Sequence, residues 1–142
     1  MYPHERSLVR LMAGKPFAIV GVNSDSNVKT ATEACRKKNL TWRSFINEQE
    51  GTNPSISKDW RVTAWPTTYL IDADGIIRYR NVRGDALDKA IERLMAEMNE
   101  NVKIVGVDHE AEDKKMMTAF KNKIEELEPA DSKPESNEKG SK

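Results

Sequence analysis

The chain has 142 residues, with 23 basic and 23 acidic side chains and no net formal charge. This balance of charge argues against a nucleic acid or a membrane surface as its partner. The length suits one domain with extensions, and a hydrophobic share of only 37% indicates that part of the chain stays outside the core.

Residues that bind metals or form disulfides are scarce. Cys35 is the one cysteine, which excludes an intramolecular disulfide. The two histidines, His4 and His109, lie far apart in the sequence and leave little material for a transition-metal site, so we expect no metal and no other cofactor. No apolar run approaches the roughly 20 residues that cross a bilayer, and residues 1–6 lack the pattern of a signal peptide.

The first third of the chain predicts a helix followed by a β-α-β unit. Residues 5–12 group their apolar side chains as a short helix does. Residues 17–22 are almost all apolar, as expected of a strand that is buried on both faces of a parallel sheet. Asn-Ser-Asp-Ser at 23–26 caps a helix that runs to about Asn39, and residues 40–46 form a second strand.

Residues 60–80 predict a loop and an antiparallel hairpin. Pro66 forces Trp65 out of the helical region, and β-branched and aromatic side chains at 67–71 favour a strand that starts at the proline. The next four residues, Asp-Ala-Asp-Gly, form a turn, and the five after them return as the second strand. Ahead of the loop, residues 56–60 form one helical turn.

The C-terminal part predicts two helices around a short apolar run. Arg-Gly-Asp at 83–85 closes the hairpin and caps the first helix. The apolar stripe of this helix consists of Leu87, Ala90, Ile91, Leu94, Met95 and Met98. Residues 102–107 are apolar enough for a short strand, and residues 110–128 predict a charged helix. The narrow stripe of the charged helix consists of Met116, Met117, Phe120, Ile124 and Leu127.

In this order and spacing, the segments resemble the TlpA-like and redoxin group of thiol–disulfide oxidoreductases. The resemblance covers residue 1 to about residue 98. The segments that carry it are Tyr2–Glu5, Pro16–Asn23, Trp42–Ser44, Trp60–Asp74 and Val82–Asp88. It implies an α/β fold, a thioredoxin-like three-layer sandwich at 1–98. An extension at 99–128 and a disordered tail at 129–142 follow this domain.

One departure from the group governs the functional interpretation, because its Cys-x-x-Cys motif is absent. Pro3 aligns with a proline in the helix that begins at that motif, so the resemblance implies an N-terminally truncated fold. The missing central strand would carry about ten hydrogen bonds at about 1 kcal/mol each, which rivals the stability of a domain. We expect that its two neighbours pair directly, that another segment fills the gap, or that the sheet is split.

The resemblance assigns substrate binding to Trp65, Pro66 and Thr67, with a cis peptide bond before the proline. In the group this loop faces the cysteine pair, and its backbone pairs with an extended substrate. The implied partner is a protein or peptide thiol or disulfide. We expect no catalytic residue in this chain and no dithiol exchange by it alone. The group usually works outside the cytoplasm, whereas the compartment and the oligomeric state of this protein stay open.

Other interpretations remain. Pro66 could have only a structural role, as the residue that starts a strand. As an alternative function, the chain would be a non-catalytic peptide-binding module that uses the proline loop and exposed sheet edges. Cys35, followed by three basic residues, would act as a single-thiol peroxidase, although its place on a helical apolar stripe favours a buried small hydrophobe. His4 and Glu5 are adjacent on a helix and do not face each other, so we expect them to be surface residues.

Overall fold

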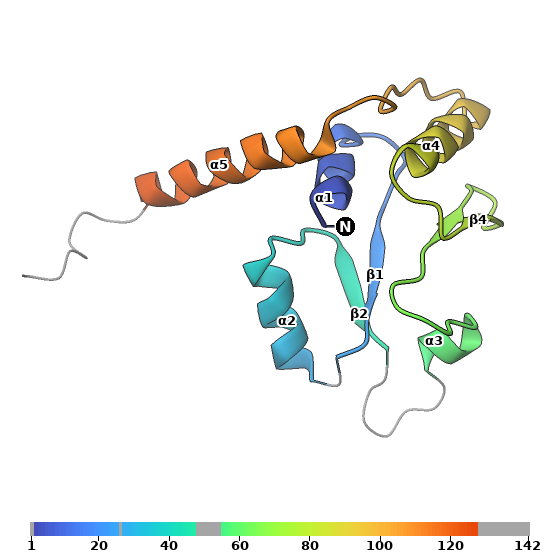
Figure 1. Cartoon of the computed structure of the whole chain (residues 1–142), viewed down its shortest axis with the longest axis horizontal. Helices are drawn as coiled ribbons and strands as arrows, with labels where there is room; N and C mark the ends of the chain where they lie inside the picture. The colour runs from blue at the N-terminus through green and yellow to red at the C-terminus, as the bar shows by residue number, and fades with distance from the viewer. Residues whose placement is uncertain (1, 26, 48–54, 128–142) are drawn as a thin grey trace, which may run out of the picture.

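The structure, a computed structural model, describes residues 2–25, 27–47 and 55–127. In chain order the elements are α1 Tyr2–Leu11, β1 Val20–Asn23, α2 Val28–Lys37, β2 Arg43–Ile46, α3 Ile56–Asp59, β3 Tyr69–Ile71, β4 Ile77–Arg80, α4 Asp85–Glu97 and α5 His109–Leu127 (Figure 1). Within these ranges, no helix combines the length and apolarity that a membrane span needs. The tail expected at 129–142 lies outside the described residues.

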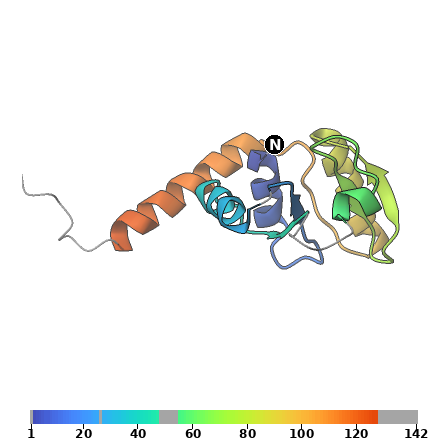
Figure 2. The ribbon, with the colours of Figure 1, turned by 90° about the horizontal axis from the view of Figure 1, so that it is seen from below.

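Within the described residues, the strands form two separate two-stranded sheets. β1 and β2 are parallel and α2 connects them, which confirms the β-α-β unit. β3 and β4 form the expected antiparallel hairpin, with Gly75 at a φ of 81° in its turn. Figures 1 and 2 place β2 and α2 on one side of β1, and the hairpin and α4 on the other. Of the three sheet arrangements that the sequence analysis left open, the described part of the chain has the split sheet.

β1 is shorter and more exposed than the apolar run at 17–22 predicted. The strand begins at Val20, whose side chain is 59% exposed. In the part of the chain that the structure describes, β1 pairs with β2 alone and the hairpin does not continue its sheet. β1 therefore lacks the surroundings that bury a central parallel strand. Phe17 and Ile19, which precede it, pack against the core instead. β2 and β3 also begin later than expected, at Arg43 and Tyr69.

The core lies between α1, α4 and the segment that follows α4. Its fully buried apolar residues are Leu8, Met12, Ile91, Met95 and Ile104. Met12 directly follows α1, and its N–H still donates to the Leu8 carbonyl at 2.9 Å. Leu8 and Met12 stand four positions apart, as do Ile91 and Met95 on α4, so each pair shares one face. Ala90 and Leu94 are buried beside them, which confirms the stripe predicted for α4.

Residues 102–107, all of which the structure describes, form an irregular segment and not the strand that their apolar side chains suggested. Ile104 is only 2% exposed. The N–H groups of Ile104 and Val105 donate to Glu92 Oε1 at 2.6 and 2.8 Å. The Glu92 carboxylate on α4 thus accepts hydrogen bonds from two backbone N–H groups that would otherwise need acceptors on a neighbouring strand.

The cap of α2 lies one residue after the predicted stretch 23–26, and the cap of α4 lies within the predicted stretch 83–85. Asn27 caps α2, since its side chain accepts from the N–H groups of Lys29 and Thr30. The cap position of α4 is Gly84, which has a φ of 53° and no side chain to accept hydrogen bonds. Asp85 is therefore the first helical residue and not the cap. At this position the Asp85 carboxylate stabilises the helix through its interaction with the helix dipole and not as a cap.

α5 packs its first turns against α1. Arg6 donates from Nε and Nη2 to the carboxylate of Asp113 at 2.7 and 2.6 Å, and Arg10 pairs with Glu112. Such a fork of two charge-assisted bonds is stronger than a single neutral one. Beyond this contact α5 leaves the body of the molecule (Figure 1), and Phe120 is 47% exposed.

The hairpin also anchors the loop that precedes it. The Tyr69 hydroxyl donates to the carbonyl of Trp60 at 2.6 Å. The two rings meet edge to face with their centroids 5.3 Å apart, and the Arg80 guanidinium lies over the Tyr69 ring. These contacts join Trp60, directly after α3, to Tyr69 on β3, and the proline loop lies between the two residues in sequence.

The contact between Glu92 and the irregular segment predicts a pH-dependent stability. The N–H donors of Val105 and Ile104 lower the pKa of Glu92. The carboxylate therefore stabilises the fold above its ordinary pKa of 4.5, and this contribution disappears as the pH falls through the lowered value. We expect Glu92→Gln to lower Tm at pH 7 and the difference from wild type to shrink in acid, as measured by circular dichroism. An exposed control, Glu110→Gln, should change Tm little; a pH-independent difference for Glu92→Gln would contradict the assignment.

The Tyr69 hydroxyl predicts a second stability effect. Tyr69→Phe keeps both ring contacts but leaves the Trp60 carbonyl without this donor, which should cost about 0.5–1.5 kcal/mol. Tyr79→Phe removes a hydroxyl from the other strand of the same hairpin and is the matched control. Urea denaturation measures both changes. Equal losses for the two variants would show that the Trp60 contact contributes nothing specific.

Candidate functional site

The loop ahead of β3 presents the three residues that the sequence assigned to substrate binding. The Trp65–Pro66 peptide bond is cis, as the resemblance implied. Trp65 is 49% exposed, Pro66 is exposed, and Thr67 is half-buried. The loop therefore places a large aromatic side chain in solvent beside the proline.

Hydrogen bonds on both sides of Pro66 hold the loop. The Thr67 hydroxyl donates to the carbonyl of Ala64 at 2.7 Å, and Arg83 Nη2 donates to the carbonyl of Pro66 at 2.8 Å. Within the described ranges, the N–H groups of Trp65 and Thr67 make no backbone hydrogen bond. A fixed backbone with available N–H groups is the arrangement that pairs with an extended peptide.

Two residues that hold this loop were missed by the sequence analysis. Asn81 has a φ of 58°. Its side chain accepts from the N–H of Thr68 at 3.1 Å, and its own N–H donates to the Thr68 carbonyl at 2.8 Å. An asparagine directly after a strand was an available signal, because asparagine tolerates the left-handed region. Arg83 carried no comparable signal, since its role depends on a bond to a residue 17 positions away.

The chain's thiol is remote from this loop. Cys35 is half-buried in the last turns of α2 rather than fully buried as expected. Figures 1 and 2 place α2 across β1 from α3 and the hairpin. A thiol on α2 does not meet a substrate that lies along the proline loop.

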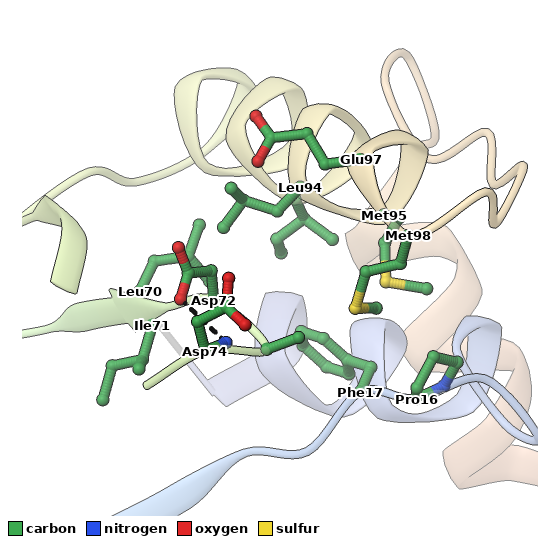
Figure 3. A pocket seen from close by; sticks show the side chains of 12 residues that line it. Pro16, Phe17, Leu70, Ile71, Asp72, Asp74, Leu94, Met95, Glu97 and Met98 are labelled. Atoms are coloured by element: carbon green, nitrogen blue, oxygen red, sulfur yellow. Dashed lines mark hydrogen bonds between the residues drawn. The ribbon is translucent and has the colours of Figure 1, made fainter. Parts of the chain in front are cut away.

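A cleft of about 370 Å³ opens between the hairpin, α4 and the segment before β1 (Figure 3). Its lining comprises Pro16, Phe17, Leu70, Ile71, Asp72, Ala73, Asp74, Ile91, Leu94, Met95, Glu97 and Met98. Arg78 bridges Asp72 and Glu97 at this cleft, at 3.0 and 2.8 Å. The N–H of Ile76 lowers the pKa of Asp72, and the Arg78 guanidinium lowers that of Glu97. The cleft is thus an apolar hollow with acidic side chains at its edge.

The two histidines meet in space, so the argument from their separation in the sequence was wrong. His4 Nε2 lies 2.8 Å from Asp88 Oδ1, and His109 Nε2 lies 3.0 Å from Asp88 Oδ2. His4 is accordingly not the surface residue that we expected. Asp88 could have indicated a buried polar cluster, because it shares the apolar face of α4 with Ile91 and Met95 at i, i+3 and i+7.

Comparisons with known proteins rest on the fold. No protein-family model matches the chain, and a search of curated proteins found no match. Two solved structures are similar. One, from Bacteroides thetaiotaomicron, is the C-terminal domain of a protein named as a thiol-disulfide oxidoreductase, with a TM-score of 0.60 and 20% identity over 68% of this chain. The other, a thiol-disulfide oxidoreductase from Bacteroides fragilis, has a TM-score of 0.59 and 23% identity over 66% of this chain.

The chain spans 65% of the length of the first of these structures and 68% of the second. The TM-scores of 0.60 and 0.59 establish a common fold. The β-α-β unit, the hairpin and the helix that follows it occur in the order expected of that fold. This protein therefore has the thioredoxin-like α/β fold of its two structural neighbours.

Proposed function

We propose that this protein takes part in thiol–disulfide exchange as a substrate-holding thioredoxin-like domain. Trp65, Pro66 and Thr67 would contact an extended, cysteine-containing segment of a protein substrate. The observation that carries the proposal is the exposed Trp65 beside backbone N–H groups on a loop held by Thr67 and Arg83. The names of both structural neighbours support the thiol–disulfide class.

The loop supplies two kinds of contact. The N–H of Thr67 lies beside a backbone that Arg83 and Asn81 hold in place, so it can bind a substrate carbonyl without first becoming ordered. The indole of Trp65 adds a large apolar surface, and aromatic side chains of this kind contribute much of the energy at peptide-binding interfaces. Backbone pairing tolerates many sequences, so this site fits unfolded or extended protein segments as a class.

The exchanging thiols are a separate requirement. Exchange needs an attacking thiolate and a second thiol that resolves the mixed disulfide. This chain has one cysteine, and it lies on α2, away from the loop. The chain thus contributes the surface that holds the substrate, and a dithiol partner performs the exchange. A module that binds peptides without any part in thiol–disulfide exchange is the less favoured interpretation, because both neighbours are named as thiol-disulfide oxidoreductases.

The lack of a thiol pair predicts that this chain alone does not catalyse insulin reduction. With dithiothreitol as reductant, insulin precipitation should proceed at the uncatalysed rate when the chain is added. A thioredoxin with an intact Cys-x-x-Cys pair is the positive control. Turnover by this chain, lost in Cys35→Ser, would overturn the division of roles and point to Cys35 as a reactive thiol.

The loop predicts where a substrate binds. A short synthetic peptide with one central cysteine, protected as a disulfide with a small thiol, is titrated into the ¹⁵N-labelled chain. We expect NMR shifts concentrated at residues 64–69 and in the Trp65 indole. Trp65→Ala should raise the Kd for the peptide about tenfold or more, which is a loss of at least about 1.4 kcal/mol of binding free energy.

Ile76→Ala is the matched control for this titration. It removes an apolar side chain that is 57% exposed at the hairpin turn, away from the proline loop. Its affinity for the peptide should equal that of wild type. Shifts centred on the cleft at Phe17 and Leu94, with full affinity in Trp65→Ala, would reject the proline loop as the binding surface.

A further inference from the structure

Three helices bring four polar side chains into one buried cluster. α1 contributes His4 and Ser7, α4 contributes Asp88, and α5 contributes His109. Asp88 is 1% exposed and Ser7 is fully buried. The side chains of His109 and His4 are 9% and 19% exposed, so the cluster faces solvent mainly at His4.

The donor atoms of the cluster converge on one point. Both imidazoles direct Nε2 at the Asp88 carboxylate, one at each oxygen, at 2.8 and 3.0 Å. The rings stack with their centroids 4.0 Å apart and an angle of 27° between their planes. One ligand atom from each of His4, Asp88 and His109 lies within 4.8 Å of the others.

This arrangement is the donor set of a metal site. We propose that His4, Asp88 and His109 bind one divalent transition-metal ion, with zinc as the preferred ion. Imidazole nitrogen favours zinc over magnesium or calcium, which take oxygen ligands. At a tetrahedral angle, two atoms bound to one zinc ion at about 2.0–2.2 Å stand about 3.3–3.6 Å apart. The hydrogen-bonded separations of 2.8 and 3.0 Å must lengthen by about 0.3–0.8 Å to reach that range. Any pair of ligand atoms nearer the 4.8 Å limit must shorten instead.

The surroundings of the cluster support a bound cation. A buried carboxylate requires a positive partner, because moving a bare charge out of water is costly. A divalent ion between Asp88 and the two imidazoles satisfies that requirement. Ser7 Oγ lies 2.9 Å from His109 Nδ1, so it orients the ring and leaves Nε2 to face Asp88. Hydrogen bonds of this kind to the second ring nitrogen are typical of metal-bound histidine.

Three protein ligands leave one position of a tetrahedral zinc shell for water. The more exposed His4 marks the side on which that position meets solvent. The ion would join α1, α4 and the first residue of α5, elements that are otherwise far apart in the sequence. This inference does not depend on the proline loop or on thiol–disulfide chemistry.

Calorimetric titration of the full chain with Zn²⁺ alone, after removal of metal with EDTA, tests the proposal. We expect one zinc ion per chain and a Tm that rises with zinc and falls again with EDTA. Ser7→Ala should weaken zinc binding about ten- to a hundredfold. His4→Gln and His109→Gln should each weaken it at least as much. Cys35→Ser removes the chain's one thiol and should leave the affinity unchanged.

A spectroscopic measurement identifies the ligands directly. Zinc should shift the ¹⁵Nε2 resonances of both histidines, and Co²⁺ should give the visible absorption of a four-coordinate site. Circular dichroism checks that each variant folds, and the wild-type titration decides the question if a histidine variant does not. The proposal is overturned by a wild-type chain that binds no zinc, by unchanged imidazole resonances, or by binding that survives His4→Gln and disappears in Cys35→Ser.

Discussion

The packing of α1 against α4 joins two parts of the protein that strand pairing, in the described ranges, leaves apart. β1–β2 and the hairpin are separate sheets, so no hydrogen-bonded ladder runs across the molecule. Leu8 and Met12 on one side meet Ile91 and Met95 on the other, with Ile104 beside them. Leu70 of the hairpin packs against this cluster. Apolar burial is non-directional, so it positions the hairpin even though the sheet is interrupted.

Local features of the fold could be predicted from the sequence, because they depend on neighbouring residues. The Asp-Ala-Asp-Gly turn and the stripe of α4 are examples, and both follow from short-range periodicity and turn chemistry. The exposure of Val20 could not be predicted in this way. An apolar run indicates burial only when other elements cover it, and the split sheet leaves this strand with a single partner.

The candidate functional residues show the same contrast between local and long-range features. Trp65, Pro66 and Thr67 are consecutive and carry a recognisable pattern, whereas Arg83 reaches Pro66 from beyond the hairpin. The cluster around Asp88 is harder still, since His4 and His109 are separated by most of the chain and meet only through helix packing. A single aspartate on an apolar helical face was its one local sign. The irregular segment at 102–107 was hard to predict for the same reason. Two of its backbone N–H groups donate to the Glu92 side chain and not to a neighbouring strand.

The contact of α5 with the body of the protein has a consequence for how the protein unfolds. The first residue of α5 bonds to a carboxylate inside the core, and the next turns pair with Arg6 and Arg10. Detaching this end would expose the core and leave Asp88 with one imidazole fewer, so it should open only together with the global transition. The far end leaves the body (Figure 1) and should fray on its own. α5 therefore spans two cooperative units within one continuous helix, and amide hydrogen exchange along it should change from slow to fast with distance from His109.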